Sequence, residues 1–303
     1  MIWELINEYP AAVLAGEGDA YFAETATQRT EGRVVVRALP DAKSGVRTRD
    51  QINAVSEGRF AMASSFAGAL ADESPAFLLS SLPFITPSAD RARALTAAAM
   101  PLYERLFAER RQKVLYVSPW PPTGLWSARA VSDTAALHAL KVRTYDKASA
   151  EVFARAATVG CVISFSDLPP KLLSGEIDAV VSSGDGDAGR RLKTWLKHYA
   201  AIAYAIPVSF GTVSLDAWDK LDTRDRTLVE AAGRDTTERQ WSALTGRVAR
   251  NYAAFRADGV AVNEQPAASV MAALRAAATQ TIADWRAGAG TEACQILDAH
   301  LAR

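Results

Sequence analysis

The amino-acid sequence predicts an α/β fold in which two lobes flank a cleft. Short apolar segments typical of strands alternate with segments whose apolar residues recur at helical spacing, the order expected of parallel sheets covered by helices. The chain has 303 residues, 49% of them hydrophobic, which is enough for two domains. Proline-rich stretches near 119–123 and 205–210 divide the alternation into two series.

The first series occupies the N-terminal part of the chain. Its strands are expected at 2–9, 32–40, 59–66 and 113–122. Its helices are expected at 19–30, 49–58 and 89–110. Gly58 closes the second of these helices, since glycine is favoured just beyond a helix end. A β-α-β-α-β order of this kind predicts a parallel sheet with helices on its faces.

The second series begins after the first proline-rich stretch. Its strands are expected at 125–131, 137–145, 159–165 and 177–183, followed by a long apolar strand region at 200–215. Its helices are expected at 147–156, 166–175 and 187–199. The chain after Asp216 has a helical pattern throughout, with one very long helix and another at 267–288. The predicted lobe I is 1–122 plus 208–250, and lobe II is 123–207 plus 251–303.

Composition excludes several classes of protein. Lys plus Arg equals Asp plus Glu at 34 each, and this balance argues against a nucleic-acid binder, which would show a basic excess. The sequence contains no run of 18 apolar residues that would span a membrane. It also shows no signal peptide, so we expect either a cytosolic protein or one whose leader has been replaced by an initiator Met.

No metal or cofactor is predicted. The two cysteines, Cys161 and Cys294, have no metal-ligand spacing; two small buried side chains are favoured over a single disulfide. The glycine-rich "SSGDGDAG" at 182–189 lacks the Lys-Ser/Thr of a phosphate loop, and we interpret it as a turn between a strand and a helix.

The candidate ligand site lies where the predicted strands end. In open α/β sheets, ligands bind beyond the carboxyl ends of parallel strands. The residues at these positions are Glu8, Tyr9, Ser65, Phe66, Pro119, Trp120, Arg143, Thr144, Tyr145, Phe165, Ser182 and Ser183. The set is mostly aromatic and hydroxyl and lacks a nucleophile–base pair, so it suits a small, partly apolar anion better than catalysis.

Arg143, in "ALKVRTYDK" (139–147), is the strongest single candidate. A guanidinium offers a planar fork that matches a carboxylate with two parallel hydrogen bonds. Arg129 lies on the preceding predicted strand, so two guanidiniums can converge on one anion. The alternative is a solvated arginine on an edge strand, or one paired with Asp146 or with a distant Glu.

Several segments resemble a known family. They are "GRVVVRALPDAKSGVRTRDQINAVSEG" (32–58), "LPFI" (82–85), "SARAVSDTAALHALKVRTYD" (127–146), "SFSDLPPKLLSGEIDAVVSS" (164–183) and "TVSLDAWDKLDTRDRTLVEAAGRDTTERQW" (212–241). In their order and spacing, over nearly the whole length, the chain resembles the DctP-type extracytoplasmic solute receptors of TRAP (tripartite ATP-independent periplasmic) transporters.

The resemblance implies a two-lobed fold like that of periplasmic binding proteins, with a long bridging helix and the ligand enclosed in the cleft. It implies a periplasmic monomer that delivers its ligand to membrane permease subunits. In the family, an arginine in the "LK-x-R" strand forms a bidentate salt bridge with the ligand carboxylate, which matches Arg143. A second arginine in the "S-x-R-A" segment often assists, which matches Arg129.

Two departures from the family bear on the ligand. Ser182, followed by Ser183, stands where the family often carries Asn, and Phe66 stands where sialic-acid-binding relatives have Glu. Both favour a compact, flat carboxylate packed against Phe66, Trp120 and Phe165, although these rings also suit ordinary core packing.

Glu8 can accept a hydrogen bond from a ligand N–H or hydroxyl, or can cap a neighbouring turn. The first possibility favours a lactam or a hydroxy acid, so we predict a small monocarboxylate of the pyroglutamate kind.

Two other functions stay open at this point. One is an α/β enzyme acting on a carboxylated small molecule, with Asp146, Glu8 or Asp185 as the base. The other is a ligand-sensing module with the same cleft. We favour the receptor.

Overall fold

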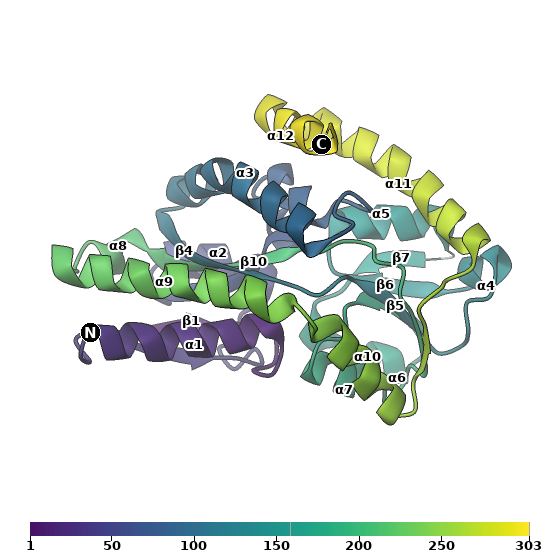
Figure 1. Ribbon diagram of the computed structural model, residues 1–303, viewed down its shortest axis with the longest axis horizontal. Coiled ribbons are helices and arrows are strands. Elements are labelled where there is room, and N and C mark those ends of the chain that lie inside the picture. The colour runs from purple at the N-terminus through teal and green to yellow at the C-terminus, as the bar shows by residue number, and fades with distance from the viewer. Residues whose placement is uncertain (158, 303) are drawn as a thin grey trace.

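Two lobes, each built around its own sheet, make up the protein (Figure 1). The computed structural model describes residues 1–157 and 159–302. The predicted α/β class with two lobes is confirmed, and the directions of two strands differ from the prediction. In the described residues, no helix has both the length and the apolar character needed to cross a membrane.

The sheet of lobe I has five strands. In spatial order they are β2 (Val35–Leu39), β1 (Ile2–Ile6), β3 (Met62–Phe66), β10 (Val208–Ser214) and β4 (Gln112–Pro119). Strands β1, β2 and β3 are parallel, but β10 runs antiparallel to both of its neighbours. The reason is that β10 starts at the cleft, where the chain arrives from lobe II, whereas β3 and β4 end there.

Helices cover both faces of this sheet. They are α1 (Leu14–Arg29), α2 (Thr48–Ser56), α3 (Ala89–Glu109), α8 (Leu215–Trp218), α9 (Thr223–Leu244) and the 3₁₀ helices η1 (Ala67–Leu70) and η2 (Pro75–Ser81). Polar side chains begin the longest ones: Ser88 accepts a hydrogen bond from the N–H of Arg91, and Asp222 accepts one from the N–H of Asp225. These caps satisfy backbone donors that a first helical turn leaves free.

The sheet of lobe II has six strands. In spatial order they are β11 (Ala261–Asn263), β9 (His198–Ala200), β5 (Gly124–Ser127), β8 (Ala179–Ser182), β6 (Lys141–Thr144) and β7 (Val159–Val162). Its helices are α4 (Thr134–His138), α5 (Lys147–Ala156), η3 (Phe165–Asp167), α6 (Leu168–Leu173), α7 (Asp187–Leu192), α10 (Arg247–Ala257) and α11 (Ala268–Gly288). Strand β5 runs antiparallel to β8, since β5 also starts at the cleft.

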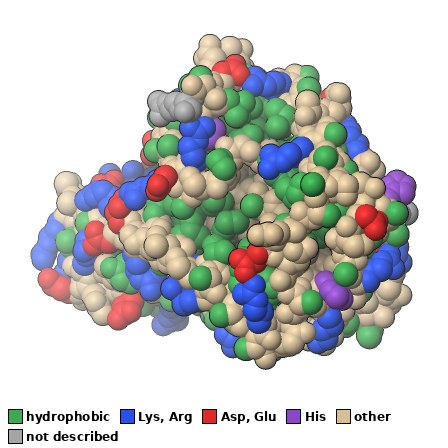
Figure 2. All heavy atoms as spheres, turned by 45° about the vertical axis from the view of Figure 1, so that its right-hand side comes forward, with side chains coloured by type: hydrophobic (Ala, Val, Ile, Leu, Met, Phe, Trp, Pro, Cys, Tyr) green, Lys and Arg blue, Asp and Glu red, His purple; other side chains and the backbone are tan. Residues whose placement is uncertain are grey.

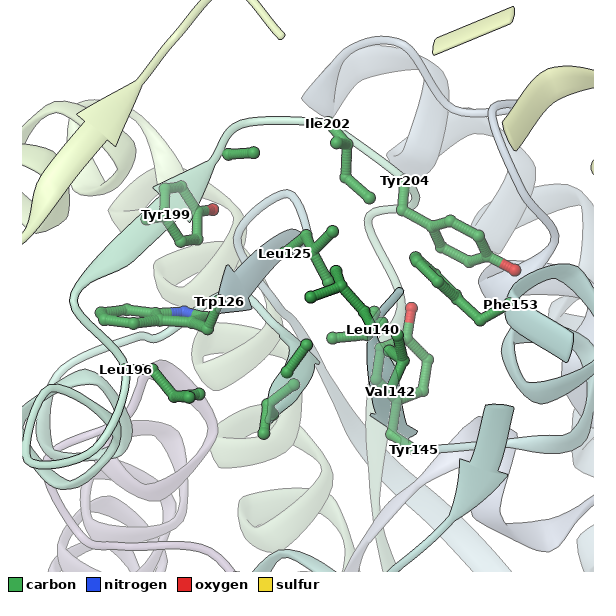
Figure 3. Close-up of a cluster of buried hydrophobic side chains, with 14 of the residues drawn as sticks. Leu125, Trp126, Leu140, Val142, Tyr145, Phe153, Leu196, Tyr199, Ile202 and Tyr204 are labelled. Carbon is green, nitrogen blue, oxygen red and sulfur yellow. The ribbon is translucent and has the colours of Figure 1, made fainter. Parts of the chain in front are cut away.

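A single apolar cluster supports the strands of lobe II (Figure 3). Trp126 packs edge-on against Tyr199 with ring centroids 5.2 Å apart, and Phe153 lies 6.2 Å from Tyr204. Leu125 and Val142 fill the space between these pairs (Figure 3) and are fully buried. Close packing of this kind fixes the strand ends that face the cleft.

Two short segments cross between the lobes side by side. Residues 120–123 carry the chain from β4 to β5, and residues 201–207 carry it from β9 to β10. Backbone hydrogen bonds join them: Trp120 N–H donates to Pro207 O at 2.8 Å, and Thr123 N–H donates to Ala205 O at 2.9 Å. Only part of the predicted strand region at 200–215 is therefore strand, because its first half is this crossing.

The predicted bridging helix is present in two pieces, α9 in lobe I and α10 in lobe II. Thr245 is extended and Gly246 has φ of +72°, and together they interrupt the helix between the lobes. Glycine adopts this left-handed conformation without the steric penalty that a side chain imposes. The two pieces follow one another from the left to the right of Figure 1.

The C-terminal helix α12 (Thr291–Leu301) packs against α3 in lobe I. The predicted division assigned all of 251–303 to lobe II, whereas in the structure the last helix of this range lies on lobe I. Helix α11 starts beside α5 in lobe II and ends near lobe I, where Trp285 Nε1–H donates to Pro75 O at 2.8 Å. The chain returns to lobe I because Leu297 of α12 is fully buried there.

Both cysteines are free thiols and each is half-buried, Cys161 in β7 and Cys294 in α12. They pack at the margins of two different apolar clusters, so the alternative of a disulfide between them is not observed.

Candidate ligand-binding site

A cavity between the lobes is walled mainly by aromatic rings, and we call it the aromatic cavity. The space within its lining that protein atoms do not fill is about 390 Å³, and this figure includes space open to solvent. Its lining consists of Tyr9, Phe66, Trp120, Thr123, Arg143, Tyr145, Phe165, Val181, Ser182, Ser183, Ala188 and Pro207. Figure 2 shows a face of the molecule whose hollowed middle gathers hydrophobic side chains, with charged ones mostly toward its edges.

The aromatic walls contact one another across the cleft. The ring centroid of Tyr9, in lobe I, lies 4.8 Å from that of Trp120, at the start of a crossing segment. It lies 5.6 Å from the centroid of Phe165, in lobe II. Phe66 of lobe I lies 5.1 Å from Tyr145 of lobe II, in an edge-on arrangement. These are favourable geometries for aromatic pairs, and they leave flat faces for an apolar ligand body.

Arg143 is the cation of this cavity. Its side chain is 2% exposed, with Nε–H donating to Ile163 O at 2.7 Å and Nη1–H to Val181 O at 3.4 Å. In the part of the chain that the structure describes, no carboxylate forms an ion pair with it. Burial lowers the pKa of Arg143, and this effect outweighs the opposing influence of Tyr9 and Glu8. The two carbonyls hold the fork in place and leave further N–H donors for an anion.

Hydroxyl groups supply the other polar atoms of the wall. Burial raises the pKa of Tyr9 and of Tyr145, so both keep their O–H protons at neutral pH. Tyr145 O–H donates to Thr123 Oγ1 at 3.4 Å, and Ser182 Oγ accepts from the N–H of Gly184 at 3.0 Å. The indole N–H of Trp120 already has a partner within the protein, because Nε1–H donates to Ser209 Oγ at 2.9 Å.

The wall of the aromatic cavity carries a net positive charge. Among its described residues Arg143 carries the single formal charge, and the others are aromatic, hydroxyl or apolar. Arg143 also faces an adjoining polar chamber, where the charges of Glu8 and Asp146 interact with it.

Six of the predicted site residues come together here. They are Arg143, Phe66, Trp120, Phe165, Ser182 and Ser183. All but Ser182 are buried. The rings of Phe66, Trp120 and Phe165 belong to the apolar cluster of lobe II and also line the cavity, so each ring has both roles. Ser182 is half-buried.

Glu8 lies outside this cavity. It lines the adjoining polar chamber, together with Thr48, Asp72, Asp146 and Lys147. The two spaces share part of their walls, namely Tyr9, Arg143, Tyr145 and Phe165. Its carboxylate accepts hydrogen bonds from the backbone N–H and the hydroxyl of Thr48 at 2.7 and 3.0 Å. The alternative that Glu8 caps a neighbouring turn is thus observed at the first residue of α2.

Arg129 does not join Arg143. It is exposed, and it donates to Ala139 O at 2.7 Å and pairs with Asp178 at 3.2 Å. The prediction that both arginines converge assumed that β5 ends at the cleft. Because β5 runs antiparallel to β8, its carboxyl end lies at the opposite edge of the sheet, roughly 10 Å or more away at 3.3 Å per residue.

Sequence reasoning missed part of the wall. Tyr9 and Tyr145 were among the strand-end residues but were not selected, although Tyr9 contacts three of the other rings. Thr123 and Pro207 lie in the crossing segments, and Ala188 lies in α7, positions that the strand-end rule does not cover. The proline-rich composition of the crossings was the available signal for the first two.

The family comparison covers most of the chain. The model of "Bacterial extracellular solute-binding protein, family 7", also called DctP, matches residues 8–286. No protein in a set of curated sequences matches significantly.

Solved structures share the fold over the full length. A Bordetella pertussis extracytoplasmic solute receptor, DctP6, binding pyroglutamic acid, has a TM-score of 0.92 at 24% identity, covering 100% of both chains. A marine metagenome TRAP solute-binding protein specific for pyroglutamate has a TM-score of 0.92 at 22% identity, covering 100% of this chain and 99% of its own. A TRAP periplasmic protein from Ralstonia eutropha with bound (S)-2-acetolactate has a TM-score of 0.90 at 20% identity, with the same coverage.

Proposed function

Because the chain belongs to family 7 of the bacterial extracellular solute-binding proteins, the DctP family, we propose that it is the periplasmic receptor of a TRAP transporter. In this proposal it captures a small organic acid through a salt bridge to Arg143, closes around it, and delivers it to the membrane permease subunits. The chain binds its ligand without transforming it.

The observation that carries the proposal is the position of Arg143. A cation that is 2% exposed and has no carboxylate partner among the described residues is costly, because burial removes its hydration. A ligand carboxylate repays part of this cost by a charge-assisted, two-point contact. The carbonyls of Ile163 and Val181 hold the guanidinium in place for that contact.

The wall favours an acid with one carboxylate and no cationic nitrogen. A second carboxylate would lie against rings and hydroxyls with no second cation to pair with it, which costs free energy. An ammonium group would likewise meet no carboxylate in the wall. A lactam N–H or a hydroxyl can instead bond to the hydroxyls of Thr123, Ser182 or Ser183.

These constraints fit a compact carboxylate of the pyroglutamate kind, whose ring can pack against the faces of Tyr9, Phe66 and Trp120. The ligands named for DctP6 and the marine receptor support this choice, and the acetolactate of the Ralstonia receptor supports the wider class of small monocarboxylates.

A thermal-shift panel on the purified full chain tests the proposal. We expect pyroglutamate to raise the unfolding temperature, since a ligand that binds only the native state stabilises it by mass action. Proline adds a cationic nitrogen, 2-pyrrolidinone lacks the carboxylate, and succinate adds a second carboxylate. Each should give a much smaller shift.

Two results would contradict the proposal. One is the absence of a shift with every monocarboxylate in a broad panel of organic acids. The other is a shift that persists unchanged in Arg143→Ala, for which a loss of roughly 2–5 kcal/mol of binding free energy is expected. A shift with succinate alone would retain the receptor and replace the ligand class.

A further inference from the structure

We propose that Glu8 is an interlobe latch, a positioning residue that retains the ligand by holding the cleft closed without touching the ligand. The inference rests on the proposed receptor function for its ligand readout, and its geometry is independent of that function. Glu8 follows β1 in lobe I, and it is 3% exposed.

Each oxygen of the Glu8 carboxylate serves a different lobe. Oε2 accepts from the N–H and the hydroxyl of Thr48, in lobe I, at 2.7 and 3.0 Å. Oε1 accepts from the hydroxyl and the N–H of Ser166, in lobe II, at 2.9 and 3.2 Å. The buried carboxylate therefore has four donors, two of which are available to it only when the lobes are together.

The residues next to Thr48 and Ser166 form a second contact between the lobes. Arg47 precedes Thr48 in the sequence, Asp167 follows Ser166, and their side chains pair across the lobes at 2.6 Å. This second pair is partly exposed, so screening by solvent keeps its net contribution small. The buried Glu8–Ser166 contact is the stronger part of the link, because hydrogen bonds to charged groups are worth more away from water.

The latch is adjacent to the aromatic cavity on both sides of the cleft. Tyr9 follows Glu8, Phe165 precedes Ser166, and the two rings face each other 5.6 Å apart on the cavity wall. Asn7 fixes the turn, since its Oδ1 accepts from Tyr9 N–H at 2.8 Å and its Nδ2–H donates to Asp19 at 2.6 Å. A ligand that brings Tyr9 and Phe165 together also brings Glu8 to Ser166.

The substitution Glu8→Gln tests this role. Glutamine replaces one oxygen by an NH₂ group, so it cannot accept from the N–H donors of both lobes. Glu4→Gln is the matched control, because Glu4 lies on β1, the strand that Glu8 follows, with its side chain exposed. With pyroglutamate in stopped-flow experiments, we expect Glu8→Gln to raise the dissociation rate about 10- to 100-fold and to leave the association rate within about twofold. Equal dissociation rates in the two variants would overturn the latch.

Ser166→Ala provides a variant with little risk to folding. It removes only the hydroxyl donor from lobe II and leaves Ser166 N–H in place. We expect an unchanged unfolding temperature without ligand and a smaller ligand-induced shift than in the native chain. A loss of stability without ligand and an undiminished ligand-induced shift would assign Ser166 a merely structural role.

A ligand-free measurement separates the latch from the proposed function. Small-angle scattering should give a larger radius of gyration for ligand-free Glu8→Gln than for Glu4→Gln, because the open form is more populated. If no organic acid binds the native chain, the receptor proposal fails and this comparison still decides on the latch. Identical radii together with identical dissociation rates would exclude it.

Discussion

The carboxylate of Asp185, in lobe II, accepts a hydrogen bond from the backbone N–H of Leu14, in lobe I, at 2.6 Å. Leu14 is the first residue of α1, so a side chain from one lobe caps a helix of the other. Asp185 is fully buried, and it also accepts from Arg247 at 2.6 Å and from Asn251 at 2.8 Å. The closed arrangement of the lobes is thus held at a second place, distinct from Glu8.

Gly186, next to Asp185, should be essential for closure. Its φ is +51°, and a Cβ at this position would overlap the carbonyl oxygen of Ala12 in the opposite lobe. We therefore expect Gly186→Ala to weaken ligand binding by more than about tenfold, because closure requires this backbone contact. Isothermal titration with pyroglutamate and scattering with saturating ligand measure the two effects.

Gly175→Ala is the control for that experiment. Gly175 has φ of +69°, and nothing lies within 4 Å of its Cβ position. Both substitutions place a side chain at a positive φ, which costs about 1 kcal/mol or more, and the ψ of −123° at Gly186 adds to that strain. Only the substitution at 186 also meets the other lobe. Equal ligand affinities in the two variants would show that the lobes close without this contact.

Arg143→Lys should weaken ligand binding about 10- to 100-fold. Lysine keeps the positive charge and loses the planar fork that binds a carboxylate at two points. Arg129→Lys is the matched control, because Arg129 is exposed and pairs with Asp178 far from the cavity. Titration calorimetry should give an unchanged dissociation constant for the control. A loss of affinity in Arg129→Lys would restore the prediction that both arginines serve the ligand.

Arg143→Met should stabilise the ligand-free protein. Methionine is unbranched like the aliphatic part of arginine and removes a buried cation, and replacing buried charge by an apolar group is often favourable by roughly 1–4 kcal/mol. The loss of the bonds to Ile163 O and Val181 O reduces this gain, so we expect about 1 kcal/mol in urea unfolding. A stability lower than that of the native chain would mean that these two bonds outweigh the buried charge.

The pH dependence of stability should carry a signature of Asp19. Burial raises the pKa of Asp19 from 3.8 to about 6, against the lowering effect of its bonds from Asn7 and Tyr116. Between pH 4 and 6 the native state binds more protons at this group than the unfolded state, so its contribution to stability falls as the pH rises and is constant above about pH 7.

Asp19→Asn removes this dependence. The difference in unfolding free energy between the variant and the native chain should move in favour of the variant by up to about 3 kcal/mol from pH 4 to pH 7. Urea unfolding at several pH values measures it, with the exposed Asp90→Asn as the control. A flat difference across this range would contradict the raised pKa.

The sequence was informative where structure depends on local pattern. The strand and helix alternation, the cleft and most of its wall follow from periodicity and from the strand-end rule, which selected Arg143, Phe66 and Trp120, and these three residues line the aromatic cavity. It failed at Arg129 because the direction of β5 depends on where the chain enters lobe II, which the strand itself does not encode.

Glycine was a second source of error. The helix expected at 19–30 begins at Leu14 in the structure, and Gly16 and Gly18, a residue type more common in loops, both lie inside it as part of α1. Each is there because another group comes close: Pro10 O at Gly16, and the Gln240 side chain of α9 at Gly18. Close approaches between distant segments depend on the tertiary structure and leave no local pattern in the sequence. For the same reason, the hydrogen-bond partners of Glu8 in the two lobes could not be predicted from its neighbours in the chain.

The paired crossings have a consequence for how the protein moves. Trp120 and Thr123 are hydrogen-bonded to Pro207 and Ala205, so the two connections form one short ribbon. The hydrogen bonds keep the two segments from sliding past one another. The ribbon can still bend perpendicular to its plane. We therefore expect this ribbon, together with the break at Thr245 and Gly246, to form the hinge about which the lobes rotate, so that the size of the bound ligand sets the final angle of closure.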